Sequence, residues 1–526
     1  MRVNAEGTGR VSPRALKTLQ WILLSLAFTC PAQAQESAPR FAVRSFQIEG
    51  DLPIPREEAL AIVSPFAGEG IEVGQLQKAA TALEEALFAR GFSFYRVILP
   101  PQDLAGVVTL RVLPFKLGNV SVKGNQYFSE ANILASLPSL RKGESPNVSQ
   151  VGRNRSAANE HPSKEVEVTF RQSDVPDSVD AEVAVLDQQP QSFFIGLNNI
   201  GERRTGNYRA TVGYQHSNLW NRDHSVTATY TTSPDHFSDV RQYGLYYRVP
   251  FYSVAGALTV FYAYSDVNSG TIANAFEVSG RGKFAGIHWR QHLVPHGAYS
   301  HALEAGLDDR YFENSVLFSG AQIGVDVRSR PVNVSYNARL DRADSVITGS
   351  IQYARNVSGG AQNDDAAYTA NRAGASPDWQ ALRYSLDGQW RVASWVLAAR
   401  LRGQYSAEPL IPGEQFGLGG AASVRGLRER EVTGDTGVSF TVEGIVPMPW
   451  AQGLSAVVFT DAGEVRSRNV PLGQPGRQDA VSVGVGLRWV VARRFSLAVD
   501  AAQVLNGTTA TESGDRRVHF SLVYRF

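Results

Sequence analysis

The segment FGLGGAASVRGLRERE (residues 416–431) precedes two strand-like segments, SFTVEGIVPMPW (residues 439–450) and AVVFTDAGEV (residues 456–465). A loop this rich in glycine can fold back on itself, because glycine accepts backbone angles that are closed to other residues. Asp461 lies in the middle of the second strand-like segment, where a lone carboxylate is unfavourable unless it faces water or a cation. Arg425 of the loop is a candidate cation for Asp461, and the surrounding strands indicate what kind of sheet carries the two residues.

The neighbouring segments alternate in polarity with a period of two residues. In QALRYSLDGQWRV (residues 380–392) nearly every second residue is apolar, and the residues between them are charged or polar. VLAARLRGQY (residues 396–405) and the C-terminal RRVHFSLVYRF (residues 516–526) repeat the pattern, and the latter would place His519 on the polar face. One face suits lipid and the other suits water. A soluble β-sandwich would alternate as well, so alternation alone leaves both folds open.

The lengths of the connections favour a membrane barrel. Long polar segments alternate with very short turns, as in outer-membrane barrels, where long loops lie on one rim and short turns on the other. The long segments are residues 266–282, 359–378, 408–437 and 466–479, and the short turns are residues 221–223, 343–344 and 493–494. Aromatic residues near strand ends, such as Tyr252 and Trp489, are expected to form an interfacial girdle.

We predict an all-β transmembrane barrel of sixteen antiparallel strands over residues 191–526. This count places Arg425 in the sixth outer loop, about residues 408–437, and Asp461 on the thirteenth strand. A hydrated lumen would weaken their ion pair, so we expect it to contribute far less than the roughly 3 to 5 kcal/mol lost when a buried pair is broken.

Composition and charge exclude several classes of protein. Lys and Arg number 51 and Asp and Glu number 50, so the formal net charge of +1 gives no electrostatic indication of nucleic-acid binding. After the N-terminal segment no run of about 18 apolar residues occurs, which excludes a helical membrane protein. Barrel strands remain possible, because they need apolar residues only at alternate positions.

Residues 1–34 are expected to be a signal peptide. Basic residues precede the apolar core WILLSLAF (residues 21–28), and Ala32-Gln33-Ala34 provides a cleavage site. The only cysteine, Cys30, lies inside this segment, and a lipid anchor there is the alternative interpretation. After cleavage, the mature chain would have neither disulfides nor thiol chemistry.

Residues 41–190 contain two copies of one strand, helix, helix, strand, strand order. The first copy, residues 41–114, has strands expected at 41–50, 92–100 and 106–113, with helices opening at Pro55 and spanning 73–90. The second copy, residues 115–190, has strands expected at 116–125, 165–171 and 180–185, with helices at 129–137 and, more faintly, near 147–159. Such a module has an exposed sheet edge that can capture an extended chain by strand addition. The alternative is two α+β modules without a shared function.

Together these features resemble a known family. The repeated βααββ order is similar to the polypeptide-transport-associated (POTRA) domain, and the whole mature chain resembles the two-partner secretion transporters (the TpsB family). The matching residues are Gly50, Gly124, Arg90-Gly91-Phe92, Leu99-Pro100-Pro101-Gln102, Leu197-Asn198-Asn199-Ile200-Gly201 with Thr205-Gly206, Val424-Arg425-Gly426, Phe459-Thr460-Asp461-Ala462-Gly463 and Phe526.

The resemblance implies a protein of the outer membrane with its POTRA domains in the periplasm. These domains would bind a large secreted exoprotein, which would cross the membrane through the barrel without any nucleotide, metal or other cofactor. The resemblance also implies that the sixth loop folds into the lumen, where Arg425 pairs with Asp461. The residues that the resemblance assigns to gating and translocation are Arg425, Asp461, Val424, Gly426, Leu427, Phe459 and Gly463. Phe92, Pro101 and Gln102 are candidate contacts for the exoprotein, Phe526 is the candidate signal for the barrel-assembly machinery, and Asn198 ends the first barrel strand.

Two departures from the family pattern accompany the resemblance. Leu427 stands where the family usually has an aromatic residue, which keeps an apolar anchor without a stacking role. Only residues 35–40 separate the expected cleavage site from the first repeat, so the sixth loop is expected to be the only plug.

The nearest alternative function is a barrel-assembly insertase of the same superfamily. A passive porin would leave residues 41–190 unexplained, and an enzyme is not indicated, since no GxSxG, HExxH or CxxC motif occurs.

Overall fold

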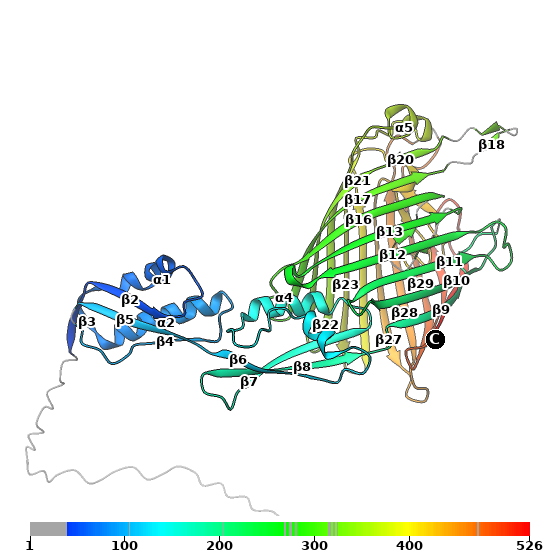
Figure 1. Ribbon diagram of the computed structural model, residues 1–526. Helices are drawn as coiled ribbons and strands as arrows, with labels where there is room; N and C mark the ends of the chain where they lie inside the picture. The colour runs from blue at the N-terminus through cyan, green and yellow to red at the C-terminus, as the bar shows by residue number, and fades with distance from the viewer. Residues whose placement is uncertain are drawn as a thin grey trace, which may run out of the picture.

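The computed structural model describes residues 39–526, apart from residues 105, 204, 268–269, 273–275, 279–280, 314–316, 319–320, 323–324 and 471–472. Two small domains lead into a β-barrel (Figure 1). The expected signal peptide, its cleavage site and Cys30 lie outside the described residues. Within the described residues, no helix is long and apolar enough to cross a membrane.

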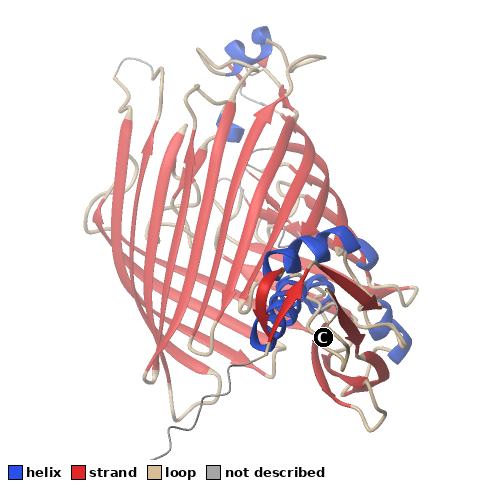
Figure 2. Cartoon of the chain, turned by 90° about the vertical axis from the view of Figure 1, so that its left-hand side faces the viewer, coloured by secondary structure: helices blue, strands red, loops and turns tan. Residues whose placement is uncertain are grey.

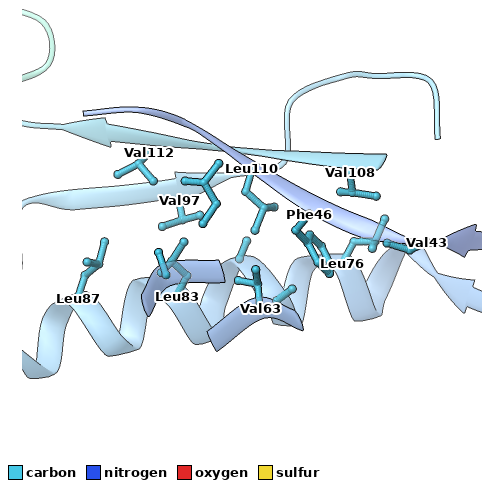
Figure 3. Close-up of a cluster of buried hydrophobic side chains, with 14 of the residues drawn as sticks. Val43, Phe46, Val63, Leu76, Leu83, Leu87, Val97, Val108, Leu110 and Val112 are labelled. Atoms are coloured by element: carbon cyan, nitrogen blue, oxygen red, sulfur yellow. The ribbon is translucent and has the colours of Figure 1, made fainter. Parts of the chain in front are cut away.

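The first domain is a three-stranded sheet covered by two helices. Its elements are β1 (Arg40–Val43), β2 (Ser45–Gly50), α1 (Arg56–Val63), η1 (Ser64–Phe66), β3 (Gly68–Glu72), α2 (Val73–Ala89), β4 (Tyr95–Ile98) and β5 (Val107–Pro114). The sheet order is β2-β5-β4, with β2 parallel to β5, and β1 pairs with β3. Leu76, Leu83 and Leu87 of α2 share one helical face and are fully buried against the sheet (Figure 3).

The second domain repeats this arrangement. Its elements are β6 (Lys116–Lys123), α3 (Glu130–Ala135), α4 (Val148–Ala158), β7 (Lys164–Gln172) and β8 (Ser178–Asp187), and its sheet order is β6-β8-β7. The helix expected near residues 147–159 is present as α4. Asn147 caps its first turn by accepting a hydrogen bond from the backbone of Gln150.

Gly50 and Gly124, which were quoted above for the family resemblance, occupy equivalent positions in the two domains: Gly50 ends β2, and Gly124 directly follows β6. Both have positive φ, +98° and +88°. A Cβ would lie 2.1 Å from the carbonyl oxygen of Val112 at residue 50, and 2.4 Å from that of Val185 at residue 124. Each first strand therefore leaves its sheet so close to the neighbouring backbone that only glycine fits.

The barrel begins directly after β8. Its strands are β9 (Gln191–Asn198), β10 (Arg209–Leu219), β11 (His224–Thr232), β12 (Gln242–Phe251), β13 (Gly256–Ser265), β16 (Gly282–His292), β17 (Tyr299–Phe312), β20 (Val327–Ser329), β21 (Pro331–Asp341), β22 (Ser345–Asn356), β23 (Gln380–Val392), β24 (Trp395–Tyr405), β27 (Thr436–Pro447), β28 (Leu454–Arg466), β29 (Arg477–Val491), β30 (Phe495–Asn506) and β31 (Arg516–Arg525). Because β20 and β21 both pair with β17, they are two segments of one strand, and the described chain closes into the predicted sixteen-stranded antiparallel barrel.

The remaining short elements lie in the connections between strands. They are η2 (Tyr252–Val254), β14 (Gly270–Ile272), β15 (Phe276–Val278), β18 (Leu317–Phe318), β19 (Ala321–Gln322), α5 (Asp365–Asn371), η3 (Pro412–Glu414), β25 (Phe416–Leu418) and β26 (Val432–Gly434). Figure 2 shows that strands build the barrel and that most of the helical residues lie in the two N-terminal domains.

The two faces of the barrel wall follow the predicted alternation. On β23, Leu386 points outward and is 48% exposed, whereas Arg383 donates to Glu414 inside the lumen. Trp489 is exposed on the outer face as a girdle residue should be. The girdle prediction was wrong for Tyr252, whose hydroxyl donates to Asp223 and whose ring packs against the second domain.

The barrel closes between its first and last strands. β31 pairs with β9 from Ser521 opposite Asn198 to Arg525 opposite Phe194. Beyond this ladder the side chain of Asn199 continues the pairing, since its amide donates to the carbonyl of Val518 at 2.7 Å and accepts from the backbone of Phe520 at 2.9 Å. At the other end the backbone of Phe526 donates to the carbonyl of Phe193.

Candidate gating site in the barrel lumen

The sixth outer loop, residues 406–435 between β24 and β27, folds back into the barrel. An apolar cluster holds it against the lumen wall. The loop contributes Leu418, Val424, Leu427 and Val432, and the wall contributes Val465, Ala480 and Val504. Val424 and Leu427 are fully buried, so Leu427 serves as the apolar anchor that its position predicts. The loop tip is thereby packed on the wall formed by β28, β29 and β30.

Glycines allow this close packing at two places. Gly426 has φ +98°, and a Cβ there would lie 2.7 Å from a methyl group of Val504. Gly463 lies on β28 beneath the loop, where a Cβ would lie 2.2 Å from a methyl group of Leu418. The sequences Val424-Arg425-Gly426 and Phe459 to Gly463 therefore form two halves of one contact surface.

Arg425 and Asp461 meet as predicted, in bidentate geometry. Nε and Nη2 of Arg425 each donate to one carboxylate oxygen of Asp461 at 2.8 Å. The backbone N–H of Arg425 donates to the same carboxylate at 3.1 Å. Two parallel bonds between a guanidinium and a carboxylate fix geometry as well as charge.

The expectation of a hydrated ion pair was wrong. Arg425 is 2% exposed and Asp461 is 0% exposed. The reason is the apolar cluster of the loop tip, which covers the pair and excludes water from it. Removing one partner would leave the other charge buried without compensation, which places the pair in the energetic class of buried rather than surface salt bridges.

Further groups complete the surroundings of the guanidinium. Nη1 of Arg425 donates to Glu443 on β27 at 2.6 Å and lies 3.6 Å from Asp500 on β30. Arg488 on β29 donates to both oxygens of Asp500, at 2.7 and 3.0 Å. The site therefore contains two arginines and three carboxylates from four neighbouring strands and the loop.

Phe459 forms the floor of the site. The central carbon of the Arg425 guanidinium lies 3.4 Å from the centroid of the Phe459 ring. The ring lies over Gly484, where a Cβ would be 2.3 Å from its Cζ. Stacking on an aromatic face stabilises a guanidinium and restricts its rotation. The alternate residues Phe459, Asp461 and Gly463 thus each contact the loop from one face of β28.

His519 also takes part, which the sequence did not predict. Its Nε2 accepts a hydrogen bond from the backbone N–H of Gly426 at 3.1 Å, and Arg517 donates to the carbonyl of Gly426. The alternation along the last strand predicts that His519 faces the lumen, and the structure confirms that placement. No local signal could have paired it with a loop more than 90 residues away.

A second anchor of the loop was missed entirely by sequence reasoning. Asp435 is fully buried and joins three outer loops. It accepts from the guanidinium of Arg372, from the backbone of Leu410 at 2.8 Å and from the backbone of Arg468 at 2.7 Å. Glu414, also buried, accepts from Arg310 and Arg383 of the wall at 2.8 Å each.

The three candidate exoprotein contacts differ in accessibility. Pro101 is exposed. Phe92 packs on the core of its own domain, with its ring 5.7 Å from that of Tyr95. The amide of Gln102 is used within the domain, since it accepts from the backbone N–H of Thr109 and donates to its carbonyl, both at 2.7 Å.

The fold and the site define an outer-membrane β-barrel with two periplasmic domains and a loop anchored inside its lumen. Residues 179–489 match the family model of the haemolysin secretion/activation protein ShlB/FhaC/HecB, and residues 41–114 match the ShlB-type POTRA domain. The first match covers more than half of the chain, so the chain belongs to the haemolysin secretion/activation family.

Similar proteins agree with this assignment. The outer membrane transporter CdiB of Escherichia coli is 22% identical over 455 residues, covering 82% of this chain and 74% of its own. CdiB of Dickeya dadantii is 22% identical over 418 residues, covering 76% of this chain and 71% of its own. The solved structure of CdiB from Escherichia coli has a TM-score of 0.73 at 18% identity, over 95% of this chain and 93% of the other. CdiB from Acinetobacter baumannii gives 0.69 at 18% identity, over 93% and 91%.

The protein is therefore an outer-membrane transporter of two-partner secretion, a family whose members work with a secreted exoprotein partner.

Proposed function

We propose that the tip of the sixth loop closes the pore between rounds of export, and that the Arg425–Asp461 pair must separate when the exoprotein passes. The observation that carries the proposal is the burial of a bidentate ion pair, one half on a loop and the other on the wall. A loop held only by apolar contacts could shift gradually. A buried bidentate pair instead favours two discrete states, bound and released.

The test is secretion of the partner exoprotein by cells that carry Arg425→Ala or Asp461→Asn. Both variants are expected to assemble at normal levels. They are expected to secrete more slowly than the unaltered protein, because the released loop tip no longer returns to one fixed position on the wall after each round. Arg402→Ala is the matched control, because Arg402 also makes a bidentate pair in the lumen, with Asp387, but is partly exposed. Normal secretion rates in both test variants, at normal protein levels, would remove the pair from the mechanism.

The two periplasmic domains capture the exoprotein, and the exposed Pro101 is the best placed of the three candidate contacts. Support comes from the exposed sheet edges of these domains, which suit an extended chain. The measurement is binding of the exoprotein's N-terminal secretion domain to the detergent-solubilised transporter, with and without residues 41–190. Equal binding by both would reject capture by these domains.

Phe526 is the signal by which the barrel-assembly machinery recognises the chain. Its side chain is 63% exposed at the end of the last strand, where a second protein can reach it. Deletion of Phe526 is expected to lower the amount of assembled barrel, measured by its heat-modifiable mobility. An unchanged amount would contradict this role.

A further inference from the structure

A short segment of the second periplasmic domain enters the mouth of the barrel. It comprises residues 159–163, between α4 and β7, together with Lys164, the first residue of β7, and it lies next to the barrel rim (Figure 1). Glu160 at its tip accepts from Arg248 on β12 and from Arg290 on β16, both at 2.8 Å, and lies 3.2 Å from Nε2 of His292. Three basic side chains of the lumen wall thus converge on one carboxylate that belongs to another domain.

The carboxylate compensates Arg248 most directly, whereas Arg290 also donates to Glu304 at 2.8 Å. Arg248 is 8% exposed, and among the described residues Glu160 is the one acid that forms an ion pair with it. Its Nη1 is buried and has no hydrogen-bond partner within the described residues. Burial raises the pKa of Glu160, but His292, Arg290 and Arg248 together hold it well below its usual range, so the group is ionised.

The ion pair between Glu160 and Arg290 separates two cavities. One, of about 1100 Å³, lies between the second domain and the barrel mouth, and His161 and Ser300 are among its lining residues. The other, of about 550 Å³, lies deeper in the lumen and is lined by residues such as Phe261. Glu160 and Arg290 line both cavities, so the pair lies where the two cavities meet.

The rest of the segment is firmly docked on the short turns of the barrel. Asp223 of the first turn is buried and accepts from Lys164, from Asn132 at 2.9 Å and from the hydroxyl of Tyr252 at 2.7 Å. Nε2 of His161 lies 2.6 Å from the carbonyl oxygen of Ser217, within hydrogen-bond distance. These contacts fix the backbone next to Glu160 against the barrel, so that its side chain reaches the lumen wall.

We propose that Arg248, Arg290 and His292 form a binding site for carboxylate side chains of the exported polypeptide, and that Glu160 occupies this site while the transporter is idle. The occupant is a polypeptide carboxylate because the present occupant is one, reaching the site from the periplasmic cavity as the exported chain would. Guanidinium groups match the planar carboxylate, and exchange of one carboxylate for another leaves no buried cation unpaired. The inference rests on the proposed export through this barrel.

The experiment measures block of the pore by peptides. The purified full chain carrying Arg425→Ala, which releases the sixth loop, is placed in planar bilayers so that a current can be recorded, and a Glu-rich peptide or its Gln-substituted counterpart is added on the side of the periplasmic domains. The Glu-rich peptide is expected to block the current and the Gln peptide to block weakly. Glu160→Gln removes the internal competitor, so the half-blocking concentration of the Glu-rich peptide should fall about tenfold or more. Adding Arg248→Gln should return it to that of the Gln peptide.

Glu182→Gln is the matched control, because Glu182 is an acid of the same domain that pairs with Lys123 and Arg171 outside both cavities. It should leave the half-blocking concentration unchanged. Normal heat-modifiable mobility shows that each variant is folded. The proposal is overturned if Glu160→Gln behaves like Glu182→Gln, or if the two peptides block equally in every variant. Because the assay does not measure secretion, either result leaves the proposed role of the Arg425–Asp461 pair to its own test.

Discussion

Arg425→Ala should release the tip of the sixth loop from the barrel wall. The substitution removes a bidentate bond to Asp461, a bond to Glu443 and the stack on Phe459. It leaves Asp461, fully buried, with Ser482 as its remaining side-chain donor among the described residues, at 3.4 Å. Breaking a buried pair by removing one partner costs roughly 3 to 5 kcal/mol. At about 1.4 kcal/mol per factor of ten, the released fraction should rise by about two to three and a half orders of magnitude.

The released fraction can be measured by thiol labelling. Val424 is fully buried beside Arg425, so Val424→Cys reports opening of the tip. Cys30 is the one native cysteine, and replacing it with serine leaves the reporter as the only thiol. The labelling rate with a membrane-impermeant maleimide follows the released fraction, because a buried thiol reacts only after opening. We expect Arg425→Ala to raise this rate by at least about a hundredfold.

Two comparisons make the result decisive. Arg402→Ala breaks an exposed lumen pair, which contributes about 0 to 1 kcal/mol, so its labelling rate should change by only a few-fold. Combining Arg425→Ala with Asp461→Ala removes the buried carboxylate that Arg425→Ala leaves unpaired, so the double variant should label more slowly than Arg425→Ala alone. If Arg425→Ala labels no faster than Arg402→Ala, the buried pair does not hold the loop.

Three further outcomes are expected. Gly484→Ala would place a Cβ 2.2 Å from the carbonyl oxygen of Ala501 and 2.3 Å from the aromatic ring under the loop arginine, and it should cost about 1 to 3 kcal/mol, lowering the temperature at which the barrel unfolds in detergent; Gly349→Ala, with its nearest contact at 3.4 Å, should not. Burial lowers the pKa of His161 to about 4, so the docked second domain favours the neutral ring. Docking should therefore weaken as pH falls from about 6.5 to about 4, by about 1.4 kcal/mol per pH unit, in a spin-label distance measurement, and His161→Gln should abolish this dependence. The hydroxyl oxygens of Ser163 and Ser217 lie 2.8 Å apart, so Ser163→Cys with Ser217→Cys should form a disulfide on mild oxidation, visible as a mobility shift that reductant reverses; no shift would contradict the docked arrangement.

The barrel was predictable because its strands and connections follow local patterns. A period of two assigns each strand residue to lipid or lumen, and the alternation of long loops with short turns fixes which rim carries each loop. Counting strands then placed Arg425 in the sixth outer loop and Asp461 on the thirteenth strand, and the pairing of these two residues was implied by the family resemblance. The faint helix near residues 147–159 was also predicted correctly, although its first-turn cap, not its apolar stripe, is its clearest feature.

The energetics of the site could not be predicted in the same way. Burial of the pair depends on how Leu418, Val424 and Leu427 pack against strands that lie up to about eighty residues further along the chain, and no local pattern encodes that contact. Asp223 reads as an ordinary turn residue, yet it is buried by residues of the preceding domain. Glu160 likewise has no neighbour in sequence that indicates its three basic partners.

The way the cylinder is sealed has a consequence for its biogenesis. The side chain of Asn199 donates a hydrogen bond to Val518, which lies 319 positions further along the sequence. The first barrel strand therefore has no partner on this edge until the last strand has been synthesised. Until then, the unclosed barrel has two edge strands, and each carries a row of unpaired backbone donors and acceptors. Such rows invite mispairing. Pairing of the last strand with the first therefore closes the barrel and also ends the period in which these strand edges can aggregate.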